Sequence, residues 1–242
     1  MSLLAVERIK LFSVRSTWWC MLLAVALPVG LAALVAGYAD RLDVRSTQAG
    51  YQFGMMVVLV LATLSITTEY RFSTIRATFL AVPNRIAALT AKTGLIAALA
   101  FVLGEAVSFG SWAIAKVMRP EAALPLGDAE TMRMVAGVGV VFAISAVLGV
   151  AVGALLRQTA GAVALLLVWS LLLEQLTMLI PNIGPDINNW MPFVAGDFFL
   201  TGGGPLSNPG APYGPWGALA YFAAVTLGVW LVAAFVVRKR DA

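Results

Sequence analysis

Long apolar segments separated by short polar loops run through this chain of 242 residues. Six of these segments are about as long as the ~20 residues that a helix needs to cross a hydrocarbon core. They lie at residues 17–38, 51–68, 90–115, 132–156, 159–180 and 214–237. Inside a bilayer no water can bond a free backbone amide or carbonyl, so these segments are expected to be helical. The pattern predicts an all-α, polytopic membrane protein with six transmembrane helices over residues 17–237.

Both chain ends and the region between the fifth and sixth spans also have distinct sequence patterns. Residues 1–16 mix charged and apolar positions and predict a short N-terminal helix that lies in the membrane interface. A simple extension of the first span is the alternative. Residues 181–213 contain six prolines, yet their middle part, 188–200, is apolar and aromatic. We expect an irregular outer segment that re-enters the membrane, and a short tail over 238–242.

The loop after the second span has the most distinctive sequence, EYRFSTIRATFLAVP at residues 69–83. On a helix, Phe72, Ile75 and Phe79 fall on one apolar stripe, while charged and hydroxyl side chains lie around it. This predicts an amphipathic surface helix over 69–80, with Phe72 and Phe79 anchoring it in the interface. A positively charged topology anchor without any further role is the alternative interpretation.

Basic residues are distributed unequally between the two sides of the predicted bundle. Of the sixteen lysines and arginines, eleven fall on the side of the N-terminus and five on the other side. Because cytoplasmic loops carry the excess of Lys and Arg, both termini are predicted to be cytoplasmic. The same rule makes the helix at 69–80 cytoplasmic and the segment 181–213 external, in a plasma (cytoplasmic) membrane.

Composition excludes several functional classes. The chain is 61% hydrophobic and only 12% charged, which a soluble domain of this length would not tolerate. It has no histidine and one cysteine, Cys20, so Ser-His catalysis, histidine metal sites and an intrachain disulfide are unavailable. We therefore predict no catalytic residue and no metal ligand. The net charge of +4 reflects membrane topology and gives no reason to expect a nucleic-acid partner.

Two carboxylates lie inside predicted spans, Glu105 in the third and Glu174 in the fifth. A charge at that depth costs about 2.5–3.5 kcal/mol, and no lysine or arginine lies at matching depth. Both residues are candidates for lining a translocation path. The alternative is that they are protonated and join neighbouring helices as structural hydrogen-bonding groups.

Small residues recur at every fourth position of the fourth span, at Ser145, Gly149 and Gly153. This spacing lets another helix approach closely, so the stripe predicts dense helix packing. The very short link at 157–159 also predicts that the fourth and fifth spans form a tight antiparallel hairpin.

Taken together, these features resemble the membrane subunits of the ATP-binding-cassette type-2 permease family. The similarity covers the whole chain. It rests on ERIKLFSVRSTWW before the first span, on EYRFSTIRATFLAVP, on the tight hairpin and on the irregular segment before the last span. The most specific part is Glu-Tyr-Arg followed by Thr-Ile-Arg in the loop after the second span, where the family commonly has the same residues.

The resemblance implies a division of labour between subunits. The chain has no Gly-x-x-x-x-Gly-Lys-Ser/Thr motif, so it is not expected to hydrolyse ATP itself. Two copies of a separate ATPase subunit would hold ATP and Mg, and a second permease, the same chain or a paralogue, would complete the transporter. The family mostly exports, which implies export, and the apolar spans and outer segment of this chain suit a hydrophobic or amphipathic substrate, such as a drug, lipid or peptide. The residues that would couple to the ATPase are Glu69, Tyr70, Arg71, Thr74, Ile75 and Arg76.

Two other functions remain open on the sequence. A proton-coupled secondary carrier would use Glu105 and Glu174 as its relay. Many carriers show a two-fold internal repeat, and none is visible between residues 1–120 and 121–242. A membrane scaffold or immunity protein that transports nothing would share the same architecture.

Overall fold

The computed structural model describes residues 3–81, 84–203 and 211–239, and every regular element in these ranges is a helix. Six helical stretches in the described part have the length and hydropathy to cross a membrane. They are Arg15–Tyr38, Val44–Arg71, Arg85–Met118, Ala129–Leu156, Thr159–Thr177 and Pro215–Lys239. The chain is therefore an all-helical, multi-pass membrane protein, which confirms the coarse prediction from the hydropathy pattern.

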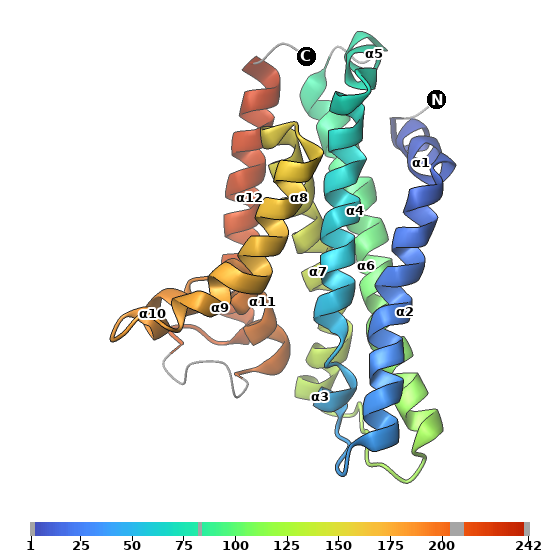
Figure 1. Ribbon diagram of the computed structural model, residues 1–242, viewed down its shortest axis with the longest axis vertical. Helices are drawn as coiled ribbons and strands as arrows, with labels where there is room; N and C mark the ends of the chain where they lie inside the picture. Colours follow the sequence, from blue (N-terminus) through green and yellow to red (C-terminus); the bar gives the residue numbers. More distant parts are fainter. Residues whose placement is uncertain (1–2, 82–83, 204–210, 240–242) are drawn as a thin grey trace.

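The helices form one elongated bundle (Figure 1). They are α1 (Leu3–Ser13), α2 (Arg15–Tyr38), α3 (Val44–Thr47), α4 (Tyr51–Arg71), α5 (Thr74–Ala81), α6 (Arg85–Met118), α7 (Ala129–Leu156), α8 (Thr159–Val168), α9 (Glu174–Thr177), α10 (Gly184–Asn189), α11 (Pro192–Thr201) and α12 (Pro215–Lys239). Figure 1 shows α1, α5 and the last turns of α12 at the same end of the bundle, which we call the α5 end. Helices α3, α10 and α11 lie toward the opposite end.

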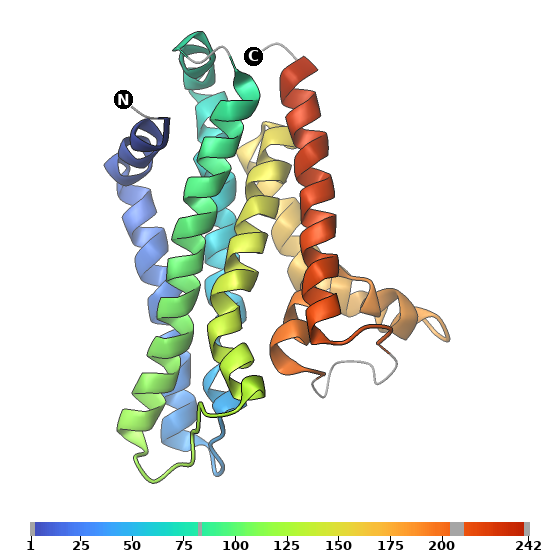
Figure 2. The same ribbon diagram turned by 180° about the vertical axis from the view of Figure 1, so that it is seen from behind.

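Helix α7 forms the centre of the bundle. Its most apolar stretch is 67% buried, against 22% for the first and fifth spans. In the view from behind, α7 lies between α6 and α12, and it also packs on α4 (Figure 2). Phe142 of α7 and Phe222 of α12 are fully buried in this core. The outer spans leave rows of leucines exposed, as helices in contact with lipid do.

Helix α6 is longer than the predicted span 90–115. It begins at Arg85 because the side chain of Asn84 accepts a hydrogen bond of 3.1 Å from the amide of Ala87 and caps the first turn. With 34 residues the helix is about 51 Å long, well beyond a hydrocarbon core of about 30 Å. Lys92, which lies near the start of the predicted span, is now more than one turn inside the helix and is buried.

The predicted surface helix at 69–80 is divided between two helices. Its first three residues, 69–71, form the last turn of α4. Phe72 and Ser73 make a turn, in which Ser73 adopts a left-handed backbone conformation with φ of 58°, and α5 then begins at Thr74. Residues 69–71 and α5 are therefore separate elements joined by a short hinge.

In its described part, residues 181–203 and 211–213, the predicted outer segment contains two short helices and is less irregular than expected. The fifth span consists of α8, a π-helical turn at Trp169–Leu173, and α9, which ends at Thr177 instead of residue 180. Figure 1 shows α9 and α10 extending sideways from the bundle. Helix α11 then packs against α12 and α7 and buries Phe193 and Phe199. This burial explains why residues 188–200 are so apolar.

Candidate functional site

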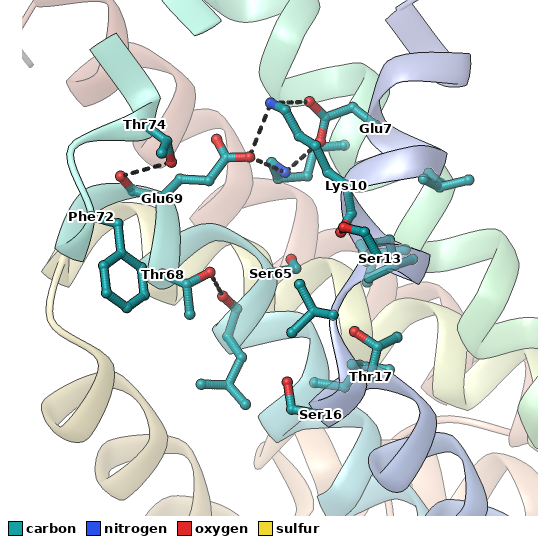
Figure 3. A pocket seen from close by; sticks show the side chains of 17 residues that line it. Glu7, Lys10, Ser13, Ser16, Thr17, Ser65, Thr68, Glu69, Phe72 and Thr74 are labelled. Carbon is teal, nitrogen blue, oxygen red and sulfur yellow. Dashed lines mark hydrogen bonds and ion pairs between the residues drawn. The ribbon is translucent and has the colours of Figure 1, made fainter. Parts of the chain in front are cut away.

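Two carboxylates and two ammonium groups from three helices meet near the α5 end (Figure 3). Glu7 and Lys10 belong to α1, Glu69 to the last turn of α4, and Lys92 to α6. The Nζ of Lys10 lies 2.9 Å from Oε1 of Glu7 and 3.1 Å from Oε1 of Glu69. The Nζ of Lys92 lies 3.0 Å from Oε1 of Glu69 and also donates to Oε2 of Glu7. We call these four residues the ion cluster.

The ion cluster is buried and its charges balance. The side chains of Glu7, Glu69 and Lys92 are 7%, 9% and 8% exposed, and only Lys10 reaches 35%. Burial opposes ionisation of Glu7, but attraction by Lys92 and hydrogen bonds from both lysines outweigh it and lower the pKa of this carboxyl. Burial likewise disfavours the charge on Lys10, yet its bonds to the two glutamates raise the pKa of this ammonium. Glu7 and Lys10 are therefore held in their charged forms.

The ion cluster also reaches α5. The Nζ of Lys10 donates a third hydrogen bond of 3.0 Å to the hydroxyl of Thr78. Ile75 of α5 is buried against the bundle nearby, at 5% exposure. Lys10 thus connects α1, α4 and α5 through a single ammonium group, while Lys92 brings in α6.

A cavity of about 460 Å³ opens beside the ion cluster, between α1, α2, α4 and α6 (Figure 3). We call it the α1 cavity. Its volume falls within the ~300–1,000 Å³ typical of small-molecule sites. The ion cluster and Thr74 line the part near the α5 end together with Phe72, and mostly apolar side chains line the deeper part, where Ser16 and Thr17 of α2 also lie. The deeper side chains include Leu61, Leu64, Leu95 and Ile96.

The residues expected to couple to an ATPase do not form one exposed surface. Glu69 and Ile75 are buried, and the ring of half-buried Tyr70 lies 4.9 Å from the guanidinium of Arg157. Arg71, Phe72 and Thr74, by contrast, are exposed. The side chains of Arg76 and Phe79 lie outside the part of the chain that the structure describes.

Glu174 joins the fifth span to the outer segment. Its side chain is 1% exposed, and it accepts hydrogen bonds from the indole of Trp169 at 2.9 Å and from the amides of Phe193 and Val194 at 3.1 and 2.9 Å. A carboxylate at the first turn of α11 satisfies free amides and interacts favourably with the helix dipole. Asn188 adds a hydrogen bond of 2.6 Å to the Glu174 carbonyl. The arrangement is that of a structural anchor.

Glu105 has a different environment from Glu174. It is half-buried on α6 and lies against the backbone of Gly139 on α7, where a Cβ would come within 2.2 Å of its Oε1. No hydrogen bond or ion pair in the described part joins it to Glu174. Neither glutamate lines the α1 cavity.

The stripe of small residues on α7 faces α4. A Cβ built on Gly149 would lie 3.0 Å from the Cβ of Ala62, and one built on Gly153 would lie 2.6 Å from a methyl group of Ile66. Ser145, one turn away, is fully buried. The two helix backbones approach more closely here than any larger side chain would allow.

Sequence reasoning did not find the ion cluster. Glu7 and Lys10 lie in the predicted interfacial helix, and Lys92 lies near the start of the predicted third span. Glu7 and Lys10 pair locally, three residues apart, but the other pairs of the cluster join residues 23, 59 and 85 positions apart. No local pattern predicts these longer pairings. Within residues 3–81, 84–203 and 211–239, no three acidic or cysteine side chains come together as metal ligands would.

Comparison with models of protein families finds no family that matches the chain, and comparison with curated proteins finds no match either.

Proposed function

We propose that the chain is the transmembrane permease subunit of an ATP-driven exporter of the ATP-binding-cassette type-2 class. Two copies of a separate ATPase subunit would bind ATP and Mg, and a second permease would complete the translocation path. The α5 end would be cytoplasmic, in the plasma membrane, and the substrate hydrophobic or amphipathic. The six membrane-spanning helices and the Glu-Tyr-Arg and Thr-Ile-Arg sequences around the hinge support this proposal.

The observation that carries the proposal is the attachment of α5 to the ion cluster. A transporter driven from outside the membrane needs a short element at the surface whose displacement reaches the spans. Helix α5 is joined to α4 by the hinge at 72–73 and to α1 by the bond from Lys10 to Thr78. Because the cluster is buried and its ions are paired, a displacement of Lys10 would act directly on α4 and, through Glu7 and Glu69, on α6.

The proposal divides the predicted coupling residues into two groups. Arg71 and Thr74 are exposed and would contact the ATPase. Glu69 is buried against both lysines and would transmit the motion instead of touching the partner. Arg76 remains a predicted contact residue, and Phe79 a predicted anchor in the interface.

A proton-coupled carrier receives less support from the geometry. A relay needs groups that exchange protons with each other or with water. Glu174 is enclosed by backbone amides and an indole, and its bonds hold the outer segment in place. The anchoring role accounts for its burial without any transport of protons.

Co-purification from the native cell tests the proposal. The tagged chain, solubilised gently from membranes, is expected to retain an ATPase subunit, and the complex to hydrolyse ATP. Arg71→Glu should weaken this association by charge reversal at the proposed contact. Arg119→Glu, which reverses a charge at the opposite end of α6, is the matched control and should retain the ATPase. Recovery of the chain without any ATPase, or equal retention in both variants, would count against the proposal.

A further inference from the structure

We propose that the α1 cavity binds an amphiphile whose head group donates hydrogen bonds, an alkylammonium ion or an alkyl alcohol, with its apolar chain directed into the bundle. This inference goes beyond the proposed function, because it concerns binding by this chain alone and holds with or without an ATPase partner.

The shape and polarity of the α1 cavity match an amphiphile oriented along the bundle. The ion cluster lies at the α5 end of the cavity, and Ser65 and Leu61 line α4 progressively farther from that end. On α6, Lys92 is followed by Leu95 and Ile96 in the same direction. A polar head would therefore lie near the surface of the bundle and an apolar tail among leucines, the orientation of amphiphiles in a leaflet.

Four of the six hydroxyl groups that line the cavity lie within hydrogen-bond distance of a backbone carbonyl, and the other two are on Ser16 and Thr17 of α2. The hydroxyls of Ser65 and Thr68 each donate to a backbone carbonyl one turn earlier, at 2.7 Å. Ser13 donates to the carbonyl of Lys10 at 2.9 Å, and Thr74 lies 3.5 Å from the carbonyl of Glu69 (Figure 3). A hydroxyl that donates to the backbone retains only its acceptor lone pairs for a ligand. This side of the cavity therefore presents acceptors.

The ion cluster adds to the same preference. The three protons of the Lys10 ammonium are matched by three acceptors, on Glu7, Glu69 and Thr78. The Oε2 atom of Glu69 is enclosed by the protein, so a ligand in the cavity does not reach it. The Lys92 ammonium donates to Glu7 and Glu69. An anionic head group would find ammonium groups that are already bonded to carboxylates, whereas a donor would find several hydroxyl oxygens.

An ammonium head matches this wall well. It supplies three N–H donors to a site rich in acceptors, and charge-assisted hydrogen bonds are stronger than neutral ones. A hydroxyl head supplies one donor and should bind by the same contacts more weakly. A trimethylammonium head has the same charge as an alkylammonium but no proton to donate.

Photo-crosslinking with ligands of one chain length tests the inference. The purified chain in phosphatidylcholine nanodiscs is labelled with dodecylamine that carries a diazirine at its tail, and the labelled peptides are identified by mass spectrometry. We expect labelling within residues 61–64 and 95–96, suppressed by unlabelled dodecylamine and not by dodecyltrimethylammonium or dodecyl sulfate. Suppression by dodecanol as well would assign a shared donor site, and suppression by dodecylamine alone an ammonium site. Equal suppression by dodecyltrimethylammonium, or no labelling of these residues, would overturn the proposal.

Two variants separate binding from folding. Thr68→Val removes an acceptor from the wall and should weaken competition by dodecylamine about five-fold, the factor that corresponds to one ordinary hydrogen bond. Thr90→Val makes the same change outside the cavity, where Thr90 also donates to the backbone one turn earlier, and should have no effect. If Thr68→Val proves unstable, Leu64→Trp fills the apolar part of the cavity and should abolish the labelling. Unchanged labelling in a folded Leu64→Trp variant would exclude this cavity as the site.

Discussion

Replacing Lys92 tests the energetic role of the ion cluster. Lys92→Met keeps most of the apolar stem of the side chain and removes the ammonium. Glu7 and Glu69 would then share only Lys10, which lies 2.9 and 3.1 Å from them and is one-third exposed. The cluster would carry one net negative charge at a site where both carboxylates are less than 10% exposed. Removing one partner of a buried ion pair costs about 3–5 kcal/mol, and we expect about 3 because Lys10 remains.

A double-mutant cycle tests whether Lys92 and Glu7 stabilise the protein through their interaction with each other. The free energy of unfolding is measured by titration with SDS in mixed micelles for Lys92→Met, Glu7→Gln and the double variant. The double variant restores charge balance and leaves the Lys10–Glu69 pair, so it should be more stable than the sum of the two single losses predicts. Lys239→Met, at an exposed position near the end of α12, is the control and should change stability by less than about 0.5 kcal/mol.

Additive losses of stability in the Lys92→Met and Glu7→Gln variants would refute the proposed coupling between these two residues. If the two single losses add within about 0.5 kcal/mol, the pair is not coupled and the cluster does not hold α1 on the bundle. A loss below about 1 kcal/mol for Lys92→Met would likewise mean that water reaches these charges freely.

Three other expectations follow from the packing and the charges. Gly153→Val places a Cβ 2.6 Å from an α4 methyl group and should cost about 1–3 kcal/mol of unfolding free energy, whereas Gly228→Val, with nothing within 4 Å, should cost far less. Glu174→Leu should speed hydrogen exchange of the first α11 amides and destabilise by about 2–6 kcal/mol, and unchanged exchange would contradict the anchor. Because the pKa of Glu7 is lowered, its contribution to stability is present above pH 4.5 and is lost as pH falls through the folded-state pKa. Because the pKa of Lys10 is raised, its contribution to stability is present below pH 10.5 and is lost as pH rises through the folded-state pKa. The contribution of the Glu7 and Lys10 charges should therefore be constant between these limits, and Glu7→Gln should flatten the acid side of the thermal-unfolding profile.

The membrane spans were predictable because the hydrocarbon core of a bilayer requires apolar side chains along the whole length of each span. A helix in lipid must be apolar along about 20 residues, and hydropathy reports that property directly. The ends of the spans were less predictable. The first turns of α6, from Arg85, lie beyond the apolar stretch and form through the cap at Asn84, which hydropathy does not record. The division of residues 69–80 depends on Glu69 pairing inside the bundle, so a helical-wheel pattern alone could not place the break.

The sequence indicated some residues of the site but not the residues with which they pair. Glu69 stood out in the sequence as part of a charged loop, yet its lysine partners come from α1 and α6. Glu174 was recognised as a costly buried carboxylate, while the amides that satisfy it belong to α11, a helix with no strong pattern of its own. Pairings of this kind depend on tertiary contacts between distant segments, and a single sequence does not encode them locally.

Crosslinking from α5 in living cells is the most direct test of the proposed function. A photoreactive amino acid replaces Thr74, an exposed residue at the start of the helix, and the cells are irradiated. The account predicts a covalent adduct with a cytoplasmic ATPase subunit, and no such adduct from the same amino acid at Arg119 on the opposite end. An adduct with an extracytoplasmic protein, or no ATPase adduct from Thr74, would contradict it.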